Sequence, residues 1–156
     1  MTAITLSGPV LGCLLALAAV AWIRRRFVVV TVVGTSMEPT FEPGDRVLAR
    51  RAGPDRLAVG DVVVVTAPSD PAGPMHAGGP VWLIKRAAAV PGDPIPRDRV
   101  PLLAGVAETT VPDGRLVLLG DSPTSIDSRQ IGYFDAERLV GVAVRRLRRR
   151  QRQTVR

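Results

Sequence analysis

The chain has 156 residues, 46% of them hydrophobic, and a formal net charge of +7. This length allows one modest domain with an extra segment, and the hydrophobic content excludes disorder throughout the chain. The single cysteine, Cys13, excludes an intrachain disulfide and a cysteine-based metal site. The excess charge lies mainly in two arginine clusters without a recognisable nucleic-acid-binding motif, so lipid head groups or solvent are the expected contacts rather than nucleic acid.

The first 26 residues are predicted to form a membrane anchor. Residues 1–23 carry no charge, 6–23 are mostly Leu, Ala, Val and Gly, and three arginines follow at 24–26. A helix over 6–23 would be about 27 Å long, close to the roughly 30 Å of a bilayer core. A cleavable signal peptide and a buried core helix are the alternatives. The first is disfavoured because no positive charge precedes the apolar run.

Short β-branched runs follow the arginines. Strands are predicted at 27–33, 46–50, 61–66, 81–86, 115–119 and 139–144, with Gly-Asp or Pro-Gly turns before or after several of them. The Pro- and Gly-rich stretch 68–80 predicts a mobile loop, and the basic tail 147–156 predicts disorder. The expected fold is mainly β, with one small domain at 27–146 preceded by a single transmembrane helix.

Lysine usage singles out one candidate for chemistry. Lys85 is the only lysine, while every other strongly basic side chain is arginine, and it lies in the apolar strand predicted at 81–86. Arginine cannot lose its proton at accessible pH, whereas a desolvated lysine can and then acts as a general base. Chance retention of one surface lysine is the alternative interpretation.

Ser36 is the matching candidate for a nucleophile. It follows a Val-rich strand and the break at Gly34, where a hydroxyl can enter a cleft near backbone N–H groups that would stabilise an oxyanion. An ordinary turn serine is the alternative. A Ser-His-Asp triad is disfavoured because the sole histidine, His76, lies in the Pro/Gly-rich stretch. No metal-ligand set and no phosphate-binding loop is present in the sequence, so no cofactor is expected.

Several short motifs follow one another along the chain in an order that indicates a protein family. It consists of SMEPT at 36–40, GD at 44–45, GDVV at 60–63, KR at 85–86 with PGD at 91–93, and GD at 120–121 with SIDSR at 125–129. The series resembles that of the type I signal peptidases, and it covers residues 27–144. The short interval between Lys85 and Gly120 resembles a near-minimal member of that family. Relative to the commonest form, the 120–129 motif is one residue shorter and has Ser122 where Asn is usual.

The resemblance implies a β-rich serine protease with residue roles at the matching positions. Ser36 would be the nucleophile and Lys85 the general base, with Ser125 orienting the lysine amine. Asp127 and Arg129 would form a supporting ion pair, with Arg86 as a further member, and Asp121 would be structural. The backbone N–H of Ser36 is one candidate oxyanion donor. Gly34 occupies the position at which some members supply a second donor from a hydroxyl side chain.

The resemblance also implies the substrate. Members cut exported precursors after small residues, typically Ala-x-Ala, by binding the peptide in an extended form between two strands. The candidates for lining shallow pockets are Val30, Val32, Met37 and Ile84, for which core packing is the alternative. The expected partners are therefore precursor proteins and membrane lipid, and no oligomeric state is predicted.

Membrane orientation presents a conflict. The arginines at 24–26 would hold the domain in the cytoplasm by the positive-inside rule, whereas exported substrates emerge on the other face. The prediction follows the resemblance: a single-pass protein of the cell membrane with its catalytic domain outside the cytoplasm.

Other functions remain as alternatives. The nearest is a maturation protease of the same family dedicated to one client, such as a nickel superoxide dismutase precursor or the leader of a modified peptide. A self-cleaving repressor with Ser-Lys chemistry is disfavoured because no DNA-binding domain is apparent. A catalytically inactive membrane-binding module would require Lys85 to be protonated and solvated.

Overall fold

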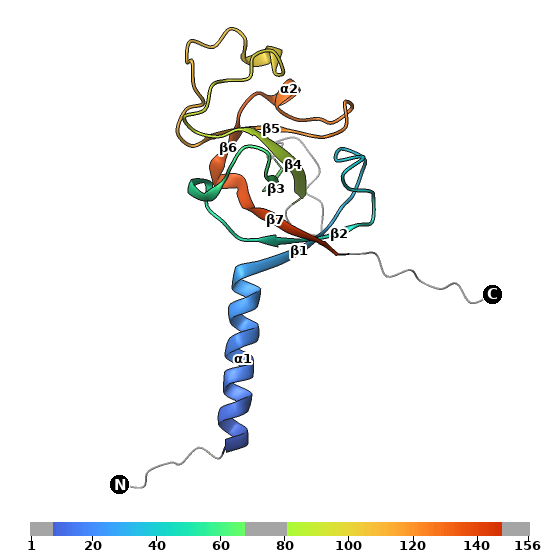
Figure 1. The fold of residues 1–156 in the computed structure, drawn as a ribbon, viewed down its shortest axis with the longest axis vertical. Coiled ribbons are helices and arrows are strands. Elements are labelled where there is room, and N and C mark those ends of the chain that lie inside the picture. The colour runs from blue at the N-terminus through green and yellow to red at the C-terminus, as the bar shows by residue number, and fades with distance from the viewer. Residues whose placement is uncertain (1–7, 68–80, 148–156) are drawn as a thin grey trace, which may run out of the picture.

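The computed structural model describes residues 8–67 and 81–147 (Figure 1). The predicted mobile loop at 68–80, which includes His76, lies outside the described residues, as does 148–156 of the predicted tail. The described part comprises an N-terminal helix followed by a mainly β domain, and the prediction of a mainly β fold is confirmed.

Seven strands form one antiparallel sheet in the order β1-β2-β7-β3-β4-β5-β6. Their bounds are β1 Phe27–Thr31, β2 Arg46–Arg50, β3 Val62–Thr66, β4 Trp82–Ala89, β5 Arg115–Leu119, β6 Phe134–Asp135 and β7 Leu139–Leu147. The last strand therefore inserts between β2 and β3 instead of joining an edge. This placement brings the C-terminal strand beside segments that come early in the chain.

Buried side chains lie on both faces of the sheet. Val63 and Val65 of β3 belong to one core cluster, whereas Val64 packs in another, with Val47 and Ile84. All three valines are fully buried. Successive strand residues point to opposite faces, so the uninterrupted valine run reflects a strand that is covered on both sides.

Short helices fill the connections. They are η1 Pro54–Arg56, η2 Pro101–Leu103, α2 Ser128–Ile131 and η3 Ala136–Arg138. Helix α2 was not predicted, although Asp127 and Gln130 have the spacing of a capping box and both of its hydrogen bonds are present. A helix of 4 residues is too short to show hydrophobic periodicity, so its cap is the only local signal.

The N-terminal helix, α1 Gly8–Arg26, extends away from the domain in Figure 1. It occupies the position of the predicted transmembrane helix. No helix within residues 8–67 and 81–147 is long and apolar enough to cross a membrane, so the predicted span is not supported. The side chains from Val10 to Arg26 are exposed, and Trp22 stacks beneath the guanidinium of Arg26 at 5.2 Å from the ring centroid.

Candidate active site

The loop between β1 and β2 carries Ser36. Two backbone hydrogen bonds join the ends of this loop. The N–H of Val32 donates to the carbonyl of Asp45 at 2.8 Å, and the N–H of Gly44 donates to the carbonyl of Val32 at 2.9 Å. Gly34 turns the chain with a φ of 83°, a conformation that favours glycine. Met37 is fully buried, so the loop is fixed in the core directly after the half-buried Ser36.

Ser36 lies against the segment that follows β5. The N–H of Ser122 donates to the carbonyl oxygen of Ser36 at 3.1 Å. Gly120 is enclosed between two serines, because a Cβ there would lie 2.5 Å from the carbonyl oxygen of Ser36 and 2.1 Å from Oγ of Ser125. The loop that carries Ser36 and the 120–129 motif therefore meet across a glycine that leaves no room for a side chain.

Lys85 reaches the same place from β4. Its side chain is 2% exposed, and Nζ donates to Oγ of Ser125 at 2.7 Å. Burial lowers the pKa of Lys85 below its ordinary value of 10.5, with Asp127 opposing the shift and Arg129 adding to it. Ser125 thus contacts the lysine amine on one side and Gly120 on the other, and Gly120 in turn contacts Ser36.

Asp127 and Arg129 form the expected ion pair, which lies at the start of α2. Nε and Nη2 of Arg129 donate to the two carboxylate oxygens of Asp127 at 2.9 and 2.7 Å, and the backbone N–H of Gly120 donates to Oδ2 at 2.7 Å. Asp127 is completely buried. Burial alone would raise the pKa of its carboxyl, but Arg129, the N–H of Gly120 and the Ser125 hydroxyl together lower it. The buried carboxylate is therefore ionised and holds Gly120 in place.

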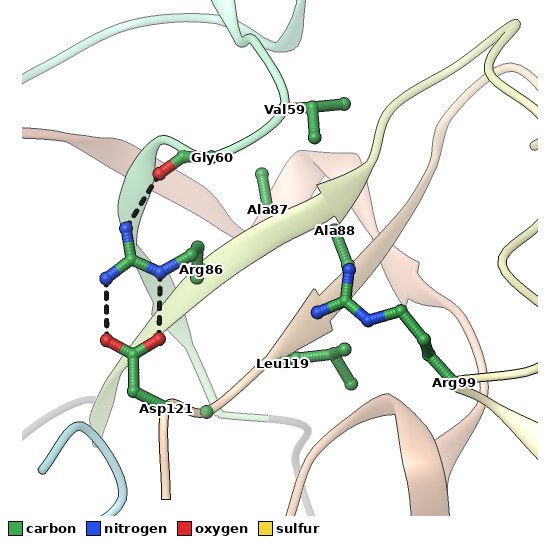
Figure 2. A pocket seen from close by; sticks show the side chains of 9 residues that line it. Val59, Gly60, Arg86, Ala87, Ala88, Arg99, Leu119 and Asp121 are labelled. Carbon is green, nitrogen blue, oxygen red and sulfur yellow. Dashed lines mark hydrogen bonds and ion pairs between the residues drawn. The ribbon is translucent and has the colours of Figure 1, made fainter.

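Arg86 does not join that pair. Its Nε and Nη2 donate to the two carboxylate oxygens of Asp121 at 2.8 and 2.6 Å, and its Nη1 donates to the carbonyl of Gly60 at 2.9 Å (Figure 2). Adjacent strand residues point to opposite faces, so Arg86 faces away from the side on which Lys85 meets Ser125. The hydrogen bonds from Arg86 and Thr40 lower the pKa of Asp121 despite its partial burial.

Two contacts that hold the loop carrying Ser36 were not predicted from the sequence. Thr40 donates its hydroxyl to Oδ2 of Asp121 at 2.6 Å. On the other side of the loop, Arg146 of β7 pairs with Asp45 at 2.7 Å and donates to the carbonyl of Thr40 at 3.2 Å. Thr40 belongs to the SMEPT motif and could have been singled out. Arg146 could not, because the sequence places it in an arginine-rich stretch and β7 was predicted to end before it.

The four predicted pocket residues, Val30, Val32, Met37 and Ile84, pack in a single core cluster. None is more than 7% exposed, so each contributes to the core around the loop that carries Ser36. Gly34, the candidate position for a second oxyanion donor, is exposed two residues before Ser36.

The described part of the chain contains no set of side chains suited to bind a metal ion. No group of three or more His, Cys, Asp or Glu side chains there could hold a metal ion. The sole histidine, His76, lies outside that part.

Comparison with known proteins identifies the family. The family model described as signal peptidase, peptidase S26, matches residues 9–103 and 98–147, which together cover most of the chain. No curated protein matches the sequence. The match spans the loop with Ser36, the strand with Lys85 and the motif from Gly120 to Arg129. The chain therefore belongs to the signal peptidase family, peptidase S26, and is a serine peptidase of the signal peptidase I type.

Proposed function

We propose that this peptidase removes signal or leader peptides from exported precursors by means of a Ser36/Lys85 dyad. The observation that carries the proposal is the buried Lys85 amine, which is bonded to Ser125 at 2.7 Å within the cluster that encloses Gly120 against Ser36. No other lysine occurs in the chain. A buried amine with a lowered pKa is the side chain best able to accept a proton from a serine hydroxyl here.

The proposed reaction has two halves. In the first, neutral Lys85 accepts the Oγ proton of Ser36 as that oxygen attacks the scissile carbonyl, and the ammonium then protonates the leaving amine. In the second, Lys85 accepts a proton from the water that attacks the acyl-enzyme ester, and the ammonium then returns the proton to Oγ of Ser36 as the ester bond breaks. Backbone N–H groups of the 34–36 turn are the proposed donors to the oxyanion. Ser125 would orient the amine, and Asp127 with Arg129 would hold Ser125 and Gly120.

An extended precursor segment is the proposed substrate. Strand β1 is an edge of the sheet with β2 as its neighbour, so its outer edge offers backbone groups to a peptide. Val30 and Val32 belong to this part of the chain, and Ile84 directly precedes Lys85. Because these side chains are at most 7% exposed, they would offer the substrate only a shallow surface, which would accept alanine-sized side chains next to the cut and exclude large ones.

The proposed location is the membrane, with the catalytic domain outside the cytoplasm. Family membership and the exposed apolar side chains of α1, followed by the arginines at 24–26, support membrane association. Protease treatment of intact and lysed cells tests the orientation: we expect the domain to be digested without entry into the cytoplasm. Protection until lysis would favour the alternative of a dedicated maturation protease.

The activity itself is tested with the purified full chain in detergent and an exported precursor. We expect one cut, with the new N-terminus read by sequencing and small residues on the other side of the cut. Failure to cut general precursors, together with cleavage of a single client, would support the dedicated protease instead. No cleavage of either class would contradict the proposed function.

A further inference from the structure

One face of the sheet is open at the strands nearest α1. The side chains on this face of β1 and β2 form three successive cross-strand pairs, Phe27–Arg50, Val29–Leu48 and Thr31–Arg46. Successive strand residues point to opposite faces, so Val30, Val47 and Ala49 point the other way and are buried in the core. Of the six paired residues, four are exposed and two are half-buried, and no core cluster of the described residues includes any of them.

Apolar side chains occupy the middle of this face. Val29 is 41% exposed and lies opposite the half-buried Leu48, and Phe27 adds an aromatic ring directly after α1. Exposed apolar side chains that lie together on one surface mark a contact site for a protein partner or a membrane. This part of the face is therefore suited to an apolar contact.

Arginines flank the apolar side chains. Arg46 and Arg50 lie at the two ends of β2, and Arg145 of β7 lies opposite Leu48. None of these three arginines has an acidic partner in the part of the chain that the structure describes. Arg146, by contrast, points to the other face and is paired with an aspartate. The open face, which comprises the three cross-strand pairs and Arg145, therefore carries an uncompensated positive charge around an apolar centre.

The open face is continuous with the end of α1 (Figure 1). β1 begins directly after Arg26, and the N–H of Arg51 donates to the carbonyl of Arg26 at 2.8 Å. The helix ends in the arginines at 24–26, and its apolar side chains are exposed. Val29 follows the helix by about 10 Å along the strand. A membrane that binds α1 therefore lies within reach of the open face.

We propose that the open face docks on anionic lipid head groups beside α1. A guanidinium matches the oxygens of a lipid phosphate with paired N–H donors, and arginines are attracted to the negative surface of an anionic membrane. Phe27, Val29 and Leu48 would then enter the boundary between head groups and acyl chains. The inference rests on the proposed membrane location, which it extends from α1 to the β domain, and it requires no step of the proposed reaction.

Charge and composition favour lipid over other partners of the open face. A second copy of the chain, bound through the same face, would bring the unpaired arginines together, where they repel each other. Nucleic acid bound through its phosphates would match the arginines but would offer no apolar contact to the centre of the face.

A spin label on the open face provides the test. The full-length protein carries Cys13→Ala and Val29→Cys, so that one nitroxide is attached at position 29. It is reconstituted in phosphatidylcholine nanodiscs with or without about 30% phosphatidylglycerol, and electron paramagnetic resonance measures the accessibility of the label to oxygen and to a water-soluble nickel chelate. We expect phosphatidylglycerol to lower the accessibility to nickel about threefold or more and to raise that to oxygen. Salt at about 0.5 M should reverse most of this change.

Substitution of the three arginines separates their role from that of α1. The combined variant Arg46→Gln, Arg50→Gln and Arg145→Gln should abolish the effect of phosphatidylglycerol, while the protein remains in the nanodisc through α1. The corresponding lysine variant keeps the charge and should retain most of the effect. Circular dichroism checks that each variant is folded.

Two matched controls test for general charge and general shielding. Arg56→Gln, Arg99→Gln and Arg115→Gln together remove the same charge from exposed arginines outside the open face and should leave the effect intact. A label at Leu102→Cys, which replaces a side chain of η2 that is 55% exposed, should stay accessible to nickel in both kinds of nanodisc.

The outcomes distinguish the lipid contact from other partners and from the proposed function. Shielding in detergent that grows with protein concentration would assign the open face to a second copy, and shielding by duplex DNA without an effect of phosphatidylglycerol would assign it to nucleic acid. Either result, or equal accessibility in the two kinds of nanodisc, would overturn the lipid contact even if the wild type cleaves precursors. Shielding that depends on phosphatidylglycerol and on the three arginines, in a protein that cleaves no precursor, would support the lipid contact and reject the proposed function.

Discussion

At the scale of single residues, the protonation of Lys85 links burial to rate. Burial lowers its pKa from 10.5, so the neutral amine needed by a general base becomes available at lower pH than for an exposed lysine. We expect kcat/KM to fall as the pH drops through this lowered pKa. Stopped assays across the pH range in which the protein stays folded would measure this acid-side fall in kcat/KM. A flat acid side over that range would contradict a role for Lys85 as base.

The same shift predicts a change in stability. Between the lowered pKa of the folded state and the ordinary value of 10.5, the unfolded chain binds more protons than the folded one. The free energy of unfolding should therefore rise with pH across this window. Lys85→Met lacks the titrating group, so the difference in unfolding free energy between wild type and variant should change across the window. A constant difference would contradict the shift.

Gly120 gives a steric prediction. A methyl group there would lie 2.1 Å from Oγ of Ser125 and 2.5 Å from the carbonyl oxygen of Ser36, so the two serines must move apart. Gly120→Ala should destabilise the protein by about 1–3 kcal/mol. It should also lower kcat by about 10²-fold, since small displacements of catalytic groups are costly. Denaturant unfolding and steady-state kinetics measure the two effects.

Gly105 is the matched control. A Cβ there meets nothing within 4 Å, so Gly105→Ala should leave both rate and stability close to those of the wild type. Equal effects from the two substitutions would show that the enclosed position of Gly120 is not the cause.

At the scale of elements, the loop that carries Ser36 is held from both sides. Thr40 joins it to the Arg86–Asp121 pair between β4 and the end of β5, and Arg146 joins it to β7. These contacts involve Thr40, which follows Ser36 in the loop, and they fix the loop against two different strands. We therefore expect Thr40 to position the proposed nucleophile.

Thr40→Val removes the hydroxyl with little change in shape. The loss of the hydrogen bond to Asp121 should cost about 0.5–1.5 kcal/mol of stability and lower kcat more than it raises KM. Thr40→Ser keeps a hydroxyl and should restore most of the rate. A Thr40→Ser variant as slow as Thr40→Val would indicate that packing, and not the hydrogen bond, fixes the loop.

Several elements were predictable because their local signals are strong. The strands at 46–50 and 115–119 agree with β2 and β5 at both ends. β4 continues to Ala89 beyond the predicted end at 86, because Ala87 and Ala89 are buried and pair with β5. β7 continues to Leu147, the first residue of the predicted tail, because residues 145–147 pair with β2 and Arg146 also forms an ion pair with Asp45. Long-range partners of this kind leave no local trace in the sequence.

The candidate site was partly predictable for a similar reason. The motif series identified Ser36, Lys85, Ser125, Asp127 and Arg129, whose spacing in the sequence can be matched to a family. The partner of Arg86, the role of Thr40 and the enclosure of Gly120 depend on how β4, β5 and the loop that carries Ser36 meet in space. The contacts of Asp121 with Arg86 and Thr40, and of Gly120 with Ser36, join residues 35 to 84 positions apart and could not be predicted without the fold.

At the scale of the whole molecule, the β domain has a core of its own. None of the three core clusters includes a residue of α1, although β1 follows that helix directly. A chain lacking residues 1–26 should therefore fold and unfold cooperatively in denaturant. Non-cooperative unfolding of the shortened chain would show that α1 contributes to the stability of the domain.

The dyad is tested most directly by single-turnover cleavage of a precursor with purified wild type, Ser36→Ala, Lys85→Met and Lys85→Arg proteins. We expect the wild type to cut after a small residue, and all three folded variants to lose on the order of 10³-fold or more in rate. Arginine keeps the positive charge but cannot become a neutral base, so its failure would identify proton abstraction as the role of Lys85. Substantial cleavage by folded Lys85→Arg protein would contradict the mechanism.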